Sequence, residues 1–189
     1  MYLLPKKNNL PSYVEVEQVF NQTQLNYLQN LAKNAEIKAG VGGQDRYKEK
    51  IRRSNIYWMP PKDDEENILS TLSETVANIN HQHFHFDLLG FQEGLQITNY
   101  EGNEQGHYAW HMDFSEGISR KLSMVIQLSD PDSYEGGNLQ LLTDSTPFTV
   151  KRQRGLAIFF PCWVLHRVTP VIKGSRQSLV AWVAGDAFR

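Results

Sequence analysis

The feature that most constrains the fold is a series of short strand-like segments in the C-terminal half, separated by turn residues. From Leu95 onward, apolar and β-branched runs alternate with turn formers such as Gly136, Gly137 and Gly155. The predicted strands are Leu95–Tyr100, Tyr108–Asp113, Lys121–Leu128, Gly137–Leu142, Phe148–Arg152, Leu156–Phe160, His166–Val171 and Gln177–Ala184. Eight short strands in roughly ninety residues predict a double-stranded β-helix, or jelly roll.

The N-terminal half predicts supporting elements around that core. Tyr13–Phe20 alternates enough for an opening strand, and Asn21 or Thr23 can cap the helix that follows. Asp63 or Asp64 begins a second predicted helix. The apolar positions of the two helices recur at helical spacing: Leu25, Leu28, Leu31, Ala32 and Ala35 in the first, and Ile68, Leu69, Leu72, Val76 and Ile79 in the second.

Composition predicts one ordinary globular domain. The chain has 189 residues, 40% of them apolar and 21% charged, which suffices for a sizeable core. We expect a mainly β protein with flanking helices: a single domain over residues 1–189, with helical support and a lid in 1–90 and the jelly-roll core in 91–189.

Charge and cysteine content exclude several classes of partner. The net charge of −2 and the lack of a basic block argue against nucleic-acid binding. The single cysteine, Cys162, excludes an internal disulfide and fits a reducing compartment. The stretch Met1–Lys7 is too short in apolar residues for a signal peptide, and no run approaches membrane-spanning length. We therefore expect a cytoplasmic protein without a membrane partner.

Two metal-binding residue types stand two positions apart, at His111 and Asp113. Side chains alternate between the faces of a strand, so both would project from one face of Tyr108–Asp113. His166 is the only histidine after Asp113, and it opens a later predicted strand. Two imidazoles and one carboxylate form the facial triad that holds non-haem Fe(II) and leaves coordination positions open. We expect His111, Asp113 and His166 to be the metal ligands and the catalytic centre.

A His-x-Asp pair alone is a weak signal, and the chain has a second one at His85 and Asp87. If His81–Asp87 were a strand, its three histidines and Asp87 would share one face. An edge strand with a polar outer face explains this pattern without a metal. We therefore predict such a strand and no metal site there.

Several stretches, in order along the chain, carry a family resemblance: Leu95–Tyr100, His111-x-Asp113, Leu128–Asp130 with Glu135–Leu139, Phe160-Pro161 before His166, and Gly174–Trp182. They resemble the Fe(II)/2-oxoglutarate dioxygenases of the prolyl 4-hydroxylase-like family. The resemblance covers about Phe84 to Ala184 and is thinner before that. It implies a jelly-roll fold, Fe(II), 2-oxoglutarate as cosubstrate and O2, with ascorbate as a further candidate.

The resemblance also implies cosubstrate-binding residues. Arg176 lies ten positions after His166, where the family has a basic residue that binds the far carboxylate of 2-oxoglutarate. A guanidinium can hold a carboxylate through two hydrogen bonds and stays charged. Tyr100 matches a tyrosine whose hydroxyl bonds to the cosubstrate, with ordinary packing as the alternative. Gln127 and Trp182 fall by strand alternation on the inner face; the role of Gln127 is left open, and Trp182 could serve packing alone.

The substrate side is predicted from the segment before the core. Ile51-Arg52 with Trp58 resembles the strand beside the substrate entrance, and Arg52, Arg53 and Trp58 are the substrate-binding candidates. Residues 39–50 contain three glycines and many charges, and their apolar residues recur at neither helical nor strand spacing. This pattern predicts a mobile loop or an inert surface loop. We hypothesise that residues 39–59 form a lid that a peptide-sized substrate orders.

These observations predict an Fe(II)- and 2-oxoglutarate-dependent dioxygenase that hydroxylates a C–H bond. The family branch favours a prolyl residue in a peptide or protein as substrate. One alternative is a hydroxylase of a free amino acid or another small molecule. A second, from a different class, is a non-catalytic metal-binding jelly roll, which would have no need of Arg176 as a cosubstrate anchor.

Overall fold

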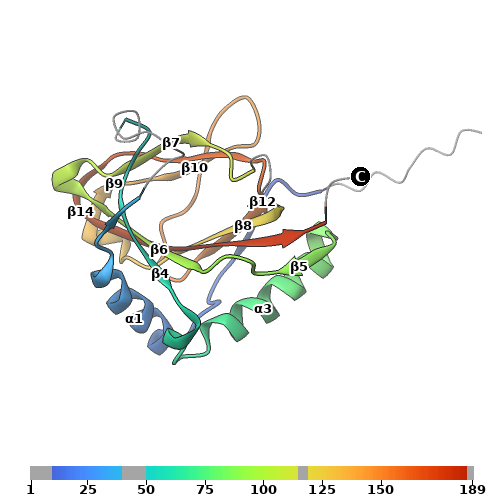
Figure 1. Ribbon diagram of the computed structural model, residues 1–189. Helices are drawn as coiled ribbons and strands as arrows, with labels where there is room; N and C mark the ends of the chain where they lie inside the picture. The colour runs from blue at the N-terminus through green and yellow to red at the C-terminus, as the bar shows by residue number, and fades with distance from the viewer. Residues whose placement is uncertain (1–9, 40–49, 115–118, 187–189) are drawn as a thin grey trace, which may run out of the picture.

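A computed structural model describes residues 10–39, 50–114 and 119–186, and in it two sheets face each other (Figure 1). The larger sheet has nine strands: β1 (Val14–Val16), β12 (Ala157–Pro161), β8 (Arg120–Gln127), β14 (Val171–Gly185), β6 (Leu95–Glu101), β4 (Asn55–Met59) and β2 (Ile37–Lys38) in that order, with β5 (Leu88–Gly90) and β9 (Tyr134–Gly136) also pairing with β14. The smaller sheet has five: β11 (Phe148–Thr149), β10 (Leu139–Leu142), β13 (Leu165–Val168), β7 (His107–His111) and β3 (Arg52–Arg53). This is the predicted jelly roll, and β3 and β4 show that the segment before the core adds a strand to each sheet.

Helices α1 (Gln22–Leu31) and α3 (Ile68–Ile79) cover the outer face of the larger sheet (Figure 1). Asn21 caps α1 as predicted: its side chain accepts from the Gln24 backbone N–H at 2.9 Å, and Gln24 returns a bond to the Asn21 N–H. The predicted apolar faces point inward, since Leu28 and Leu72 are fully buried. Both helices therefore pack the scaffold and stand away from the site.

Helix α3 begins later than predicted. A 3-10 turn, Pro61–Asp63, intervenes, and the first residue of α3 is Ile68. The Asp64 carboxylate instead accepts from the Leu69 N–H at 3.1 Å, so it serves the first turn of the helix from outside it. The prediction that Asp63 or Asp64 starts the helix was wrong by about one turn.

The predicted edge strand over His81–Asp87 was also wrong. Asn80–Phe84 continues α3 as a π-helical turn, closed by a bond from the His85 N–H to the Asn80 carbonyl at 2.8 Å. The Asn80 amide then bonds both backbone groups of Phe86. The alternation of histidine and phenylalanine resembles a strand pattern. Phe84 nevertheless lies in a helical turn, and its side chain is buried.

Strand β14 separates two apolar clusters and thereby places the site. Leu179, Ala181 and Val183 belong to the cluster between the larger sheet and the helices. The intervening residues, Ser178, Val180 and Trp182, point into the space between the sheets. No helix among the described residues is long and apolar enough to cross a membrane.

Candidate metal and cosubstrate site

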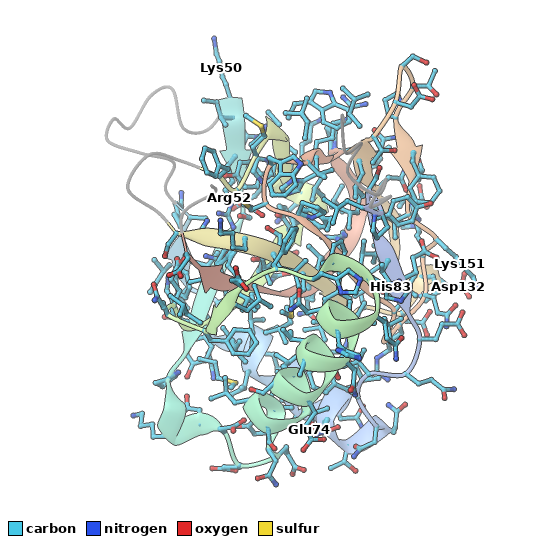
Figure 2. The ribbon with its side chains drawn as sticks, turned by 90° about the vertical axis from the view of Figure 1, so that its right-hand side faces the viewer. Lys50, Arg52, Glu74, His83, Asp132 and Lys151 are labelled. Carbon is cyan, nitrogen blue, oxygen red and sulfur yellow. The ribbon has the colours of Figure 1, made fainter. Side chains whose placement is uncertain are left out.

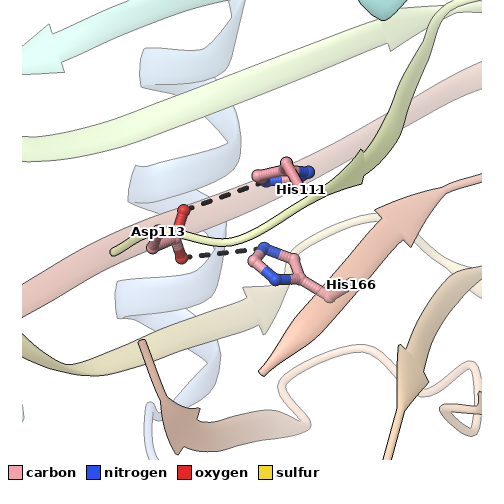
Figure 3. Close-up of side chains that lie close together, drawn as sticks. All are labelled: His111, Asp113 and His166. Carbon is pink, nitrogen blue, oxygen red and sulfur yellow. Dashed lines mark ion pairs between the residues drawn. The ribbon is translucent and has the colours of Figure 1, made fainter. Parts of the chain in front are cut away.

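His111, Asp113 and His166 meet between the two sheets (Figure 3). His111 ends β7, and His166 lies directly opposite it in the antiparallel neighbour β13. The Asp113 carboxylate lies between the imidazoles, 3.8 Å from Nε2 of His111 and 3.6 Å from Nε2 of His166. Within the described ranges, this is the only group of three or more such side chains able to hold a metal ion together.

Asp113 lies beyond the end of β7, so strand alternation does not set the direction of its side chain. Strand β7 stops at His111, and the backbone N–H groups of Asp113 and Phe114 both donate to the Cys162 carbonyl, at 2.9 and 3.1 Å. The Ser123 hydroxyl, from β8, donates to Asp113 Oδ2 at 2.7 Å. The predicted proximity of His111 and Asp113 is correct, but contacts from the larger sheet and the β12–β13 turn produce it.

Both imidazoles are oriented for metal binding. Nδ1 of His111 lies 2.8 Å from the Ala109 carbonyl, and Nδ1 of His166 lies 3.0 Å from the Val164 carbonyl. A carbonyl accepts only from a protonated nitrogen, so each ring carries its proton on Nδ1 and keeps the Nε2 lone pair free. The Tyr108 ring stacks on His111 with centroids 3.4 Å apart and limits its rotation.

The site has the protonation state that a cation requires. Burial, together with the neighbouring His166, lowers the pKa of His111 to about 3. Burial alone would raise the pKa of Asp113, but the imidazoles of His166 and His111 outweigh it and the pKa is lowered. At neutral pH the site therefore offers a neutral imidazole and a carboxylate, a donor set that suits Fe(II).

A cavity of about 500 Å³ extends from these ligands. The residues along its walls are Arg52, Trp58, Glu93, Gln96, Tyr100, Tyr108, His111, Met112, Asp113, Arg120, Val125, Leu139, His166, Val168, Arg176, Ser178, Val180 and Trp182. Metal ligands at one wall and an arginine at another suit a ligand that reaches from the metal to a guanidinium.

Arg176 is the largest fully buried side chain, with 1% of its surface exposed. Its Nη1 reaches the Ser178 hydroxyl at 3.4 Å, while Nε and Nη2 have no hydrogen-bond partner. A buried guanidinium without an anion is unfavourable, because it has lost water and gained no counter-charge. The unpartnered donors fit the distal carboxylate of 2-oxoglutarate.

Of the other predicted cosubstrate-binding residues, two line the cavity and one does not. Tyr100 and Trp182 line the cavity, as expected, and the Arg176 guanidinium lies 5.5 Å from the Tyr100 ring centre. Gln127 pairs with Ser178 across the sheet, but its amide donates to the Lys151 carbonyl at 2.6 Å and does not line the cavity. The structure thus does not bring the Gln127 side chain to the cavity, because a backbone carbonyl from another segment of the chain engages it.

The substrate-side predictions divide too. Arg52 and Trp58 line the cavity. Arg53, the next residue of β3, points to the other side and donates to the Glu104 carbonyl at 2.6 Å. Residues 40–49 of the predicted lid lie outside the described residues. Of the rest of that segment, Arg52–Arg53 form β3 and Asn55–Met59 form β4.

Five polar wall residues were not predicted: Gln96, Tyr108, Glu93, Arg120 and Ser178. Gln96 shares the strand parity of Tyr100, so alternation could have indicated it. Arg120 donates to the Glu93 carboxylate from both Nε and Nη2 and stacks over Trp182 at 3.9 Å. Nothing local signals that pair, because its members are 27 residues apart.

Sequence comparison finds similarity to 2OG-Fe(II) oxygenases and to a hydroxylase. Residues 95–184 match a sequence profile of the 2OG-Fe(II) oxygenase superfamily. A PKHD-type hydroxylase of Synechococcus sp. (strain CC9605) is 37% identical over 103 residues, which are 52% of this chain and 45% of the relative. The matched segment is thus less than half the length of that relative.

Two solved structures show the same fold. A Pseudomonas putida prolyl-4-hydroxylase has a TM-score of 0.73 at 20% identity, covering 93% of this chain and 94% of that one. A Trichoplax adhaerens prolyl hydroxylase, solved with a hypoxia inducible factor oxygen degradation domain peptide fragment, has a TM-score of 0.75 at 14% identity, covering 95% and 84%.

Proposed function

Because residues 95–184 belong to the 2OG-Fe(II) oxygenase superfamily, we propose that the protein is an Fe(II)- and 2-oxoglutarate-dependent dioxygenase that hydroxylates a C–H bond. One observation carries the proposal: the triad and the unpartnered guanidinium of Arg176 face a single cavity. A non-catalytic metal-binding module would need the triad but not Arg176, since a buried unpaired arginine destabilises the fold until an anion binds.

The chain's own residues account for positioning and shielding. His111, Asp113 and His166 would hold Fe(II), which with 2-oxoglutarate and O2 supplies the oxidising chemistry. Arg176 would fix the distal carboxylate of the cosubstrate, which sets the cosubstrate's orientation towards the ligands. The aromatic walls, including Tyr108 and Trp182, exclude water from the reacting centre.

For the substrate, we propose a prolyl residue in a peptide or protein. The support is the activity of the two similar structures: both are prolyl hydroxylases, and one was solved with a peptide. A free amino acid or other small molecule is the second candidate, favoured by the charge of Arg52 on the cavity wall. The buried single cysteine, Cys162, supports a proposed cytoplasmic location.

The test is succinate formation from 2-oxoglutarate with Fe(II), with and without proline-containing peptides. The wild-type protein should form succinate, and His166→Ala should not, because two ligands hold the metal too weakly. His85→Ala is the matched control, since His85 belongs to the second His-x-Asp pair and lies outside the cavity. Full activity in His166→Ala, or equal loss in His85→Ala, would contradict the proposal.

A further inference from the structure

The fixed charges along the cavity suggest a property of the substrate, and this step rests on the function proposed above. The walls carry three guanidinium groups, Arg52, Arg120 and Arg176, and two carboxylates, Glu93 and Asp113. In a partly desolvated cavity, an unmatched charge is costly, so each group should find a counter-charge in the loaded enzyme.

Two of the three guanidinium charges would have a counter-charge in the loaded enzyme. Arg120 is engaged by Glu93 through two nitrogens and lies over the Trp182 ring. Arg176 would be matched by the distal carboxylate of 2-oxoglutarate. Asp113 and the remaining cosubstrate carboxylate would together balance the two charges of Fe(II), which leaves the positive charge of Arg52.

Arg52 has only neutral partners among the described residues. Its Nε donates to the Ser54 hydroxyl and its Nη2 to the Gln96 side-chain oxygen, both at 2.9 Å. Its guanidinium also lies over the Tyr108 ring, 4.6 Å from the centroid. These contacts use the Nε–Nη2 edge of the fork, the edge with which Arg120 binds Glu93. The Nη1–Nη2 edge can also hold a carboxylate through two bonds, and Nη1 makes no hydrogen bond to a described residue.

The position of Arg52 ties this charge to the reacting centre. The Tyr108 ring contacts Arg52 and also stacks on the metal ligand His111. Figure 2 shows Lys50 projecting from the edge of the molecule, whereas Arg52, two residues later, lies over its body. An anion on Arg52 would thus be held one aromatic ring away from a metal ligand.

We propose that Arg52 binds a carboxylate of the substrate, and that the oxidised C–H bond lies within about one residue of that carboxylate. The chemistry is shared by two sources: a free amino or other small organic acid, and a peptide whose prolyl residue adjoins an acidic side chain or the C-terminal carboxylate. A neutral internal Pro-containing segment would leave the charge of Arg52 unmatched.

The experiment compares acids with their amides. The probes are L-proline and L-prolinamide, and one proline-containing pentapeptide in three forms: free C-terminal carboxylate after the proline, C-terminal amide, and amide with aspartate beside the proline. Binding to protein loaded with Mn(II) and 2-oxoglutarate is followed by saturation-transfer NMR, and turnover with Fe(II) by succinate formation. The acids should bind and react in preference to the amides. A response to L-proline would identify a free acid as the source of the carboxylate, and a response to the pentapeptides would identify a peptide.

Variants locate the effect. Arg52→Gln should raise the KM for the preferred acid at least about tenfold, as expected for loss of one partner of a desolvated charge pair. Arg53→Gln is the matched control, because Arg53 precedes Ser54 on the same strand segment but points away from the cavity. Arg52→Lys keeps the charge and should recover part of the affinity, which separates charge loss from any folding defect.

The outcomes distinguish the two levels of proposal. If Mn(II)-loaded protein fails to bind 2-oxoglutarate by calorimetry, the proposed function is wrong. If 2-oxoglutarate binds but no acid probe binds, or amides serve as well as acids, the carboxylate inference is overturned while the function stands. An equal loss for acids and amides in Arg52→Gln would also overturn it, because the arginine would then support only the shape of the cavity.

Discussion

At the scale of single residues, hydrogen-bond partners hold the three proposed metal ligands in place. Ser123 is fully buried and makes the side-chain hydrogen bond to Asp113 Oδ2. Carbonyls of Ala109 and Val164 orient the two imidazoles. Such outer contacts fix ligand geometry before the metal arrives, which lowers the entropy lost on binding.

Ser123→Ala should weaken metal binding about 10- to 100-fold, the range for loss of an outer-shell hydrogen bond. The carboxylate would be free to rotate, while the fold should persist because the hydroxyl alone is removed. Mn(II) titration by calorimetry measures the change without any turnover. Ser119→Ala is the control, since that hydroxyl bonds Gln92 at the surface; equal affinity in both variants would remove Ser123 from this role.

The depressed pKa of His111 gives the metal-free protein a pH-dependent stability of definite sign. The imidazole takes up a proton near 6.5 in the unfolded chain and near about 3 in the fold. Between these values the unfolded state binds more protons, so the free energy of unfolding falls as the pH is lowered. The lowered pKa of Asp113 acts in the same direction, but only as the pH falls through its ordinary value of 3.8 and below.

The urea midpoint of the metal-free protein should therefore be lower at about pH 5 than at about pH 7.5. The difference should shrink in His111→Asn, which has no proton to gain at this position. A pH dependence that is unchanged by this substitution would show that other groups cause it.

At the scale of elements, the turn after β9 shapes the cavity wall around Arg176, the proposed cosubstrate anchor. Gly137 has φ +60°, and a Cβ there would lie 2.9 Å from Val171 Cγ2 and 3.0 Å from Arg176 Cδ. Arg152 bonds the Gly136 carbonyl and the Asn138 side chain on either side. The glycine leaves room for the arginine stem, and the clamp holds the turn against it.

Gly137→Ala should displace Arg176 and raise the dissociation constant of 2-oxoglutarate several-fold, with little change in metal affinity. Calorimetry on Mn(II)-loaded protein measures both constants. Gly90→Ala is the matched control: it also has a positive φ, +115°, but nothing lies within 4 Å of its Cβ. Similar losses in both variants would mean that backbone strain alone is responsible.

At the scale of the whole molecule, the proposed ligands would join the two sheets. The imidazole ligands lie on β7 and β13 of the smaller sheet, whereas Arg176 lies on β14 of the larger one. Binding to the folded state alone adds RT ln(1 + [L]/Kd), about 2.7 kcal/mol at a hundredfold excess over Kd. Metal and cosubstrate should thus stabilise the sandwich in two steps.

Thermal unfolding should show a rise in Tm with Mn(II) and a further rise when 2-oxoglutarate is added. In Arg176→Gln the first rise should remain and the second should largely disappear, because the metal ligands are intact and the carboxylate partner is lost. A full second rise in this variant would place the distal carboxylate elsewhere.

The sequence by itself determined what depends on local pattern. Strand alternation predicted most strands of the core, and the inward faces of α1 and α3 followed from helical spacing. The grouping of His111, Asp113 and His166 was predictable because few residue types bind iron and one histidine follows Asp113. These signals lie within a few residues of each other or in the chemistry of the side chain.

The tertiary structure decided what depends on contacts between distant segments. It packed Phe84 into the core from the helical turn Asn80–Phe84, engaged Gln127 with a backbone carbonyl, and turned Arg53 away from the cavity. It also paired Glu93 with Arg120, and left Arg52 among neutral partners. Each outcome depends on a partner contributed by packing, and a side chain's sequence neighbours carry no record of that partner.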